Sequence, residues 1–220
     1  MAGKRAWLAV WLGLLVVSLA GIHPAFGGGV TGRVVDHKGN AVEQAVVFVH
    51  TAPPDVPLPP TPDVAVMDQV NKNFVPEVLP IAVGTAVSFP NHDQVHHHVY
   101  SFSKAKTFEI PLYKGEAGEP IVFNKVGVVK VGCNIHDWML GIILVVPTPF
   151  FTMTDAAGQY TLRDLPPGDY TLASWHRRSR TKVDKTLQQH RIESGTIQAD
   201  FTLKLRRGRS RPASNSARYD

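Results

Sequence analysis

The chain contains the run Cys133-Asn134-Ile135-His136-Asp137-Trp138-Met139, which is its most informative chemical feature. It offers a thiolate at Cys133, an imidazole at His136 and a thioether at Met139. Upstream, the run His96-His97-His98 belongs to a segment typical of a strand. Two imidazoles, one thiolate and a weak axial thioether form the ligand set of a blue-copper site.

Cys133 is the only cysteine, so it cannot form an intramolecular disulfide. In an oxidising compartment an unpaired thiol is a liability unless something holds it. A bound metal would solve this problem, because a coordinated thiol is deprotonated and occupied. The alternative is an inert buried cysteine that packs as a small apolar residue, and the neighbouring His136 and Met139 argue against it.

The N-terminus reads as a secretory signal peptide over residues 1–27. Lys4 and Arg5 precede an apolar run from Ala6 to Ala20, and Ala25-Phe26-Gly27 resembles a cleavage site, with cleavage after Ala20 as the variant. The apolar run is shorter than the roughly 20 residues that a membrane span needs. We therefore expect export to the periplasm.

The net charge of +5 is unevenly distributed. From Lys204 onward there are six basic residues and one acidic residue, whereas residues 28–203 hold 15 basic and 17 acidic side chains. The body is nearly neutral, and residues 205–220 read as a disordered basic tail. Such a tail favours contact with a membrane surface over contact with nucleic acid in an exported protein.

The rest of the chain predicts an all-β fold. Pro-rich residues 53–63 read as a linker. Between residues 64 and 147, eight short apolar runs alternate with turns, which is typical of a β-sandwich. The runs are residues 64–66, 78–81, 86–89, 97–102, 107–110, 121–123, 128–131 and 141–146.

Residues 64–147 resemble a cupredoxin of the amicyanin and plastocyanin type. The run Val87-Ser-Phe-Pro-Asn91-His-Asp93-Gln-Val-His-His97-His-Val-Tyr-Ser101 is similar to the family's first-histidine strand, and Cys-x2-His-x2-Met is its short ligand loop. The resemblance implies a Greek-key sandwich holding one type 1 copper ion. Its metal ligands would be His97, Cys133, His136 and Met139.

Two points in the histidine run stay open. His96 is the rival of His97, which shares its strand parity with Val95 and Val99, the positions expected to face inward. The position after the first histidine is often Asn in cupredoxins, where it ties the ligand loop to the sandwich. Here it is His98, whose ring could take over that role.

The flanking segments resemble a carboxypeptidase regulatory-like β-sandwich. The resemblance rests on the hairpin Gly32 to Val49 and on the turns at Asp155 to Tyr160 and Leu165 to Tyr170. It implies one discontinuous domain, residues 28–52 and 148–204, with the cupredoxin inserted; two sequential domains are the alternative. The arrangement resembles bacterial proteins labelled methylamine utilization proteins.

These features predict a monomeric, non-enzymatic periplasmic electron carrier that docks transiently with a redox protein such as a cytochrome or dehydrogenase. The alternatives are a copper-delivery protein and an extracellular interaction module. A zinc site is disfavoured by the thioether. Thiol catalysis is disfavoured because His136 is too near Cys133 in sequence to act as an oriented base.

Overall fold

The computed structural model describes residues 28–61 and 63–207. The predicted signal peptide and residues 208–220 of the predicted tail lie outside this range. No helix in the described ranges is long and apolar enough to cross a membrane.

The described part of the chain is all-β, apart from one 3-10 turn, η1 (Val183–Lys185). Residues 64–146 supply the strands β3 (Val64–Val66), β4 (Asp68–Val70), β5 (Asn73–Val75), β6 (Val78–Ala82), β7 (Ala86–Ser88), β8 (His97–Ser103), β9 (Lys106–Tyr113), β10 (Ile121–Val122), β11 (Gly127–Cys133) and β12 (Leu140–Val146). They form a five-stranded sheet in the order β6-β12-β11-β8-β9, a three-stranded sheet β10-β7-β3, and the hairpin β4-β5. We call this part the first sandwich.

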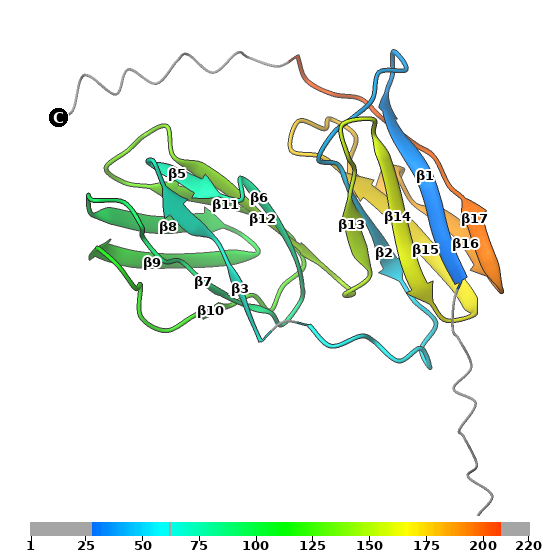
Figure 1. The fold of residues 1–220 in the computed structure, drawn as a ribbon, viewed down its shortest axis with the longest axis horizontal. Coiled ribbons are helices and arrows are strands. Elements are labelled where there is room, and N and C mark those ends of the chain that lie inside the picture. Colours follow the sequence, from blue (N-terminus) through cyan, green and yellow to red (C-terminus); the bar gives the residue numbers. More distant parts are fainter. Residues whose placement is uncertain (1–27, 62, 208–220) are drawn as a thin grey trace, which may run out of the picture.

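The strands before and after the first sandwich pair with one another. They are β1 (Gly28–Asp36), β2 (Val46–Thr51), β13 (Phe151–Met153), β14 (Gln159–Leu165), β15 (Gly168–Trp175), β16 (Gln188–Ile192), β17 (Gly195–Gln198) and β18 (Phe201–Leu203). One sheet has the order β14-β1-β17 with β18 also on β1, and the other has the order β13-β2-β15-β16. In this second sandwich, β1 and β2 therefore bond to strands more than 100 residues away, and the first sandwich is inserted between them (Figure 1).

Turns in the second sandwich form where short polar side chains replace missing backbone partners. Asp36 accepts hydrogen bonds from the amides of Lys38 and Asn40, at 2.8 and 3.0 Å. Asp155 does the same for Ala157 and Gln159, at 2.9 and 2.8 Å. These Asx turns explain why Asp is found at both positions.

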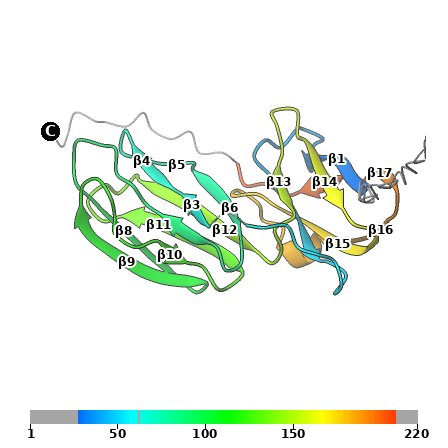
Figure 2. The same cartoon turned by 60° about the horizontal axis from the view of Figure 1, so that its bottom comes forward.

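Two strands are buried on both faces and join the two sandwiches. In β12, Ile143 and Val145 face the core of the first sandwich. The alternate residues Ile142, Leu144 and Val146 pack with Val46 and Phe48 of β2 in a separate cluster. Continuous apolar runs are expected for strands covered on both sides, and the two sandwiches accordingly lie side by side in Figures 1 and 2.

The predicted all-β fold class, in which one β-sandwich is inserted into a second small β-sandwich, is confirmed by the strand pairing. All eight apolar runs predicted between residues 64 and 147 contain strands. The hairpin β4-β5 was not predicted. One expectation was wrong: Val95 is 36% exposed, because β8 begins only at His97 and the inward alternation does not reach back to residue 95.

Removal of an aromatic ring at the junction should destabilise the protein. Phe48 is 3% exposed, so Phe48→Ala should lower the free energy of unfolding by about 3 kcal/mol. The matched control is Phe102→Ala, because Phe102 is 80% exposed and its loss should cost less than about 0.5 kcal/mol. Urea unfolding followed by circular dichroism measures both. Equal losses of unfolding free energy in the two variants would contradict the burial of Phe48 at the junction.

Candidate metal centre

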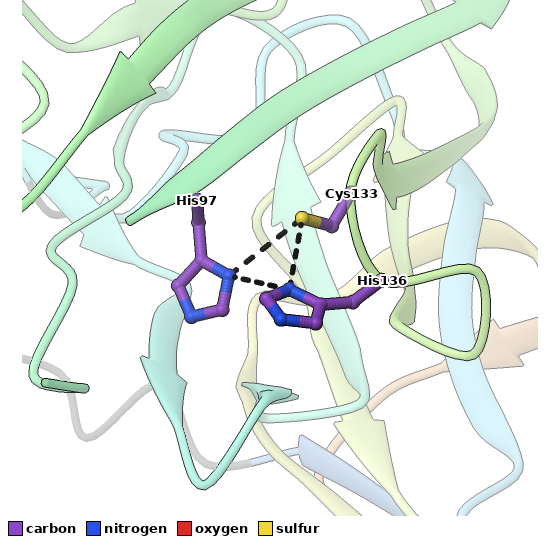
Figure 3. Close-up of side chains that lie close together, drawn as sticks. All are labelled: His97, Cys133 and His136. Atoms are coloured by element: carbon purple, nitrogen blue, oxygen red, sulfur yellow. Dashed lines mark hydrogen bonds between the residues drawn. The ribbon is translucent and has the colours of Figure 1, made fainter. Parts of the chain in front are cut away.

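Three potential ligand atoms converge at one end of the first sandwich. The Sγ of Cys133 lies 3.6 Å from Nδ1 of His97 and 3.5 Å from Nδ1 of His136. The two Nδ1 atoms are 3.2 Å apart. Figure 3 shows both rings turned so that these nitrogens face the sulfur. All three residues are buried.

The size of this triangle fits a metal ion. A point equidistant from three atoms at these separations lies about 2 Å from each, which is the length of typical bonds from His and Cys to metal ions. Neutral imidazole nitrogen and thiolate sulfur together suit copper or zinc. The three donors can therefore hold one ion.

Strand pairing brings the donors together. His97 opens β8 and Cys133 closes β11, and the antiparallel register pairs Cys133 with Val99. The amide of Asn134 donates to the carbonyl oxygen of His98 at 3.0 Å, which extends the pairing into the ligand loop. The loop then turns so that the amide of Met139 donates to the carbonyl oxygen of His136 at 2.9 Å.

Asp93 orients His97 from outside the triangle. The Nε2 atom of His97 lies 2.8 Å from Oδ2 of Asp93. A proton held on Nε2 leaves Nδ1 as a lone-pair donor facing Cys133, which is how outer carboxylates commonly fix the tautomer of metal-binding histidines. Asp93 is itself held by the backbone amides of Asn71 and Lys72, the latter at 2.8 Å.

The protonation equilibria of the cluster reflect these contacts. Burial raises the pKa of the Cys133 thiol, but the side-chain contact with His97 and hydrogen bonds with backbone groups outweigh burial and leave the pKa lowered. For His97, burial lowers the pKa, yet the contacts with Cys133 and Asp93 raise it overall. Burial and the nearby His97 lower the pKa of His136. A lowered thiol pKa and a neutral His136 both favour metal binding.

Three of the four predicted metal ligands lie together, and the fourth, Met139, lies in the adjoining core. His97, Cys133 and His136 form the cluster, whereas the rival His96 is exposed. Met139, the last residue of the ligand loop before β12, is 2% exposed and packs in the core of the first sandwich. The ring of His98 lies 2.8 Å from Glu109, and it is the carbonyl of His98, not its ring, that bonds to the ligand loop.

The contact between Asp93 and His97 was not predicted from the sequence. Asp93 precedes His97 by four residues in the sequence, but this spacing alone does not bring the two side chains together. The conformation of the loop from Asn91 to Val95 makes the contact possible. The Asn91 side chain shapes this loop by donating to the carbonyl oxygens of Val95 and Tyr113, at 2.9 and 3.1 Å.

No family model matches this sequence, and neither does any curated protein. Among solved structures, the oxidized state of a point mutant of amicyanin is 20% identical with a TM-score of 0.34, over 38% of this chain and 82% of that one. A purple cupredoxin from Nitrosopumilus maritimus is 28% identical with a TM-score of 0.33, over 38% and 99% of the two chains. A Cu-containing nitrite reductase from Thermus scotoductus SA-01 is 30% identical with a TM-score of 0.35, over 43% and 24%. Because these TM-scores are below 0.5, the similarity does not by itself define fold or function.

Loss of the Asp93 carboxylate should weaken metal binding without removing a ligand. We expect Asp93→Ala to lower copper affinity by roughly 10- to 100-fold, since an unbraced imidazole must be ordered on binding. Asp93→Asn, which keeps one acceptor oxygen, should fall between Asp93→Ala and the unmodified protein. Titration in competition with a chelator measures all three.

The control for this prediction is Asp137→Asn, because Asp137 is exposed on the ligand loop itself. Its copper affinity should equal that of the unmodified protein. An Asp93→Ala variant with unchanged affinity would contradict the orienting role.

Proposed function

We propose that this protein is a periplasmic type 1 copper protein of the cupredoxin class that carries single electrons between redox partners. The observation that carries the proposal is the buried triangle of His97, Cys133 and His136. Met139 is the proposed axial ligand, because it is buried and follows His136 by three residues. Bound copper would supply a one-electron couple between Cu(II) and Cu(I).

The role of the protein scaffold is to hold the ligand atoms in fixed positions. His97 is fixed by Asp93, and Cys133 ends a strand that is paired on both sides, with β8 and β12. A donor set that moves little between two oxidation states needs little reorganisation, which favours rapid electron exchange. Burial and bracing also favour retention of the ion over its delivery to another protein.

The expected route for electrons is the edge of His136. This residue is 8% exposed, whereas His97 is fully covered. The Trp138 ring packs 5.3 Å from the His136 ring, and the neighbouring Ile135 and Leu140 are 48% and 43% exposed. These apolar side chains offer a small surface for transient docking, the kind that redox encounters use. The proposed partner is a cytochrome or dehydrogenase.

Export and a non-enzymatic role complete the proposal. The signal-peptide pattern of residues 1–27 supports a periplasmic location. An electron carrier of this kind needs no substrate pocket, and we assign no catalytic residue.

The copper-loaded oxidised protein should show a strong visible absorption band from thiolate-to-copper charge transfer. Cys133→Ser should abolish the band, because the sulfur is the electron source of the transition. His97→Gln should also abolish or shift it, whereas the adjacent control His96→Gln should leave it unchanged. If the band persists in Cys133→Ser, Cys133 is not the copper ligand that this proposal requires.

Repeated redox cycling separates electron transfer from copper delivery. We expect a small cytochrome to reduce and reoxidise the copper-loaded protein over many cycles, with the ratio of copper to protein unchanged. Leu140→Lys should slow the exchange with the cytochrome, because it places a charge in the apolar docking surface. Progressive loss of copper during cycling would instead favour a delivery protein.

A further inference from the structure

Basic side chains from distant segments meet beside the junction of the two sandwiches. The connection between β15 and β16 contributes Arg180 and Lys182, and the end of the described chain contributes Arg206 and Arg207. Backbone hydrogen bonds join these two segments, because the amide of Arg180 donates to Lys204 at 2.7 Å and that of Arg206 donates to Arg178 at 2.9 Å. The cations are thus held together by the fold.

Residues of the first sandwich lie next to these basic side chains. Val128 of β11 lines a groove of about 820 Å³ together with Arg180, Lys182 and Arg206. Lys130 is exposed and shares the strand face of Val128, since strand faces alternate. Its backbone amide donates to the Ser103 hydroxyl at 2.9 Å, which places the end of β8 next to it.

An aromatic side chain is exposed to solvent at this end of β8. Phe102 is 80% exposed, and its ring packs at 5.1 Å only against its own strand neighbour Tyr100 among the ring contacts of the described residues. Lys104 follows in the exposed turn between β8 and β9. We define the basic surface as Phe102 with the cations at positions 104, 130, 180, 182, 206 and 207.

Two carboxylates lie next to cations outside this surface. Asp184 lies 3.8 Å from Lys185, and Glu77 forms an ion pair with Arg177. The basic surface therefore keeps an excess of positive charge. In the sequence this surface leads directly into the remaining tail, which adds Arg209, Arg211 and Arg218.

The basic surface is well separated from the metal centre. Phe102 lies five residues after His97 on β8, or about 16 Å along a strand. Lys130 is on the outer face of β11, whereas Val129, Val131 and Cys133 face the core. A protein bound at the basic surface would be poorly placed to exchange electrons at His136.

We propose that the basic surface binds an anionic phospholipid membrane. Clustered Lys and Arg attract anionic headgroups, and an exposed aromatic beside them suits the boundary between headgroups and acyl chains. The metal centre would then point away from the membrane, with its apolar docking surface open to soluble partners. An acidic protein is the rival occupant.

Vesicle flotation tests this proposal with the chain from Gly28 to Asp220. We expect binding to vesicles of phosphatidylcholine with 30% phosphatidylglycerol at 50 mM NaCl, little binding at 500 mM NaCl, and little binding to phosphatidylcholine alone. The metal-free protein should bind equally well, so failure of the copper assignment would leave this result intact.

Charge-reversal variants locate the binding surface. Arg180→Glu with Lys182→Glu should lower vesicle partitioning at least about tenfold, and Phe102→Ser should lower it several-fold. The matched control is Lys38→Glu with Lys114→Glu, two exposed lysines outside the basic surface, which should have a much smaller effect.

Deletion of residues 208–220 should weaken binding but not abolish it. Complete loss on this deletion, or equal loss in the control, would overturn a role for the folded surface. Absence of vesicle binding, together with capture of an acidic redox protein that Arg180→Glu and Lys182→Glu abolish, would assign the surface to the rival occupant.

Discussion

The pairing of β8 with β11 is the constraint on which the site depends. Val99 faces Cys133 in this antiparallel pair, and the amide of Asn134 adds one more bond to His98. This register places His97 at the same end of the sandwich as the ligand loop that carries His136. A slip of one residue would turn Cys133 away from the core and separate the sulfur from both imidazoles. The donor triangle is therefore a product of strand register as much as of ligand identity.

The second sandwich acts on the first through a shared apolar layer. Because β12 and β2 are buried on both faces, Leu144 and Phe48 belong to one cluster that spans the junction. The strand that leaves the ligand loop, β12, is thereby packed from two sides. The same junction brings Val128 next to Arg180 and Lys182 and creates the basic surface. The insertion thus fixes both the support of the metal centre and the orientation of the proposed membrane-binding face.

Much of this could be predicted from sequence because the signals are local. Three donors fall within one loop, apolar runs of strand length recur between turns, and the run containing His97 has a strand pattern. The contact of Asp93 with His97 could not be predicted, since it depends on amides of the unpredicted hairpin β4-β5. Val95 was misplaced because the strand pattern does not show where β8 begins. The sequence indicated only the basic tail, which begins at residue 205, as a candidate for membrane contact. The complete basic surface could not be predicted because its charges lie up to about 100 positions apart.

X-ray absorption at the copper edge of the loaded protein measures which atoms bind the ion. We expect two imidazole nitrogens at about 2.0 Å and one directly bonded sulfur around a single copper ion. A spectrum with only oxygen and nitrogen neighbours, or with sulfur absent from the first coordination sphere, would contradict the assignment of Cys133 as a ligand and with it the proposed electron carrier.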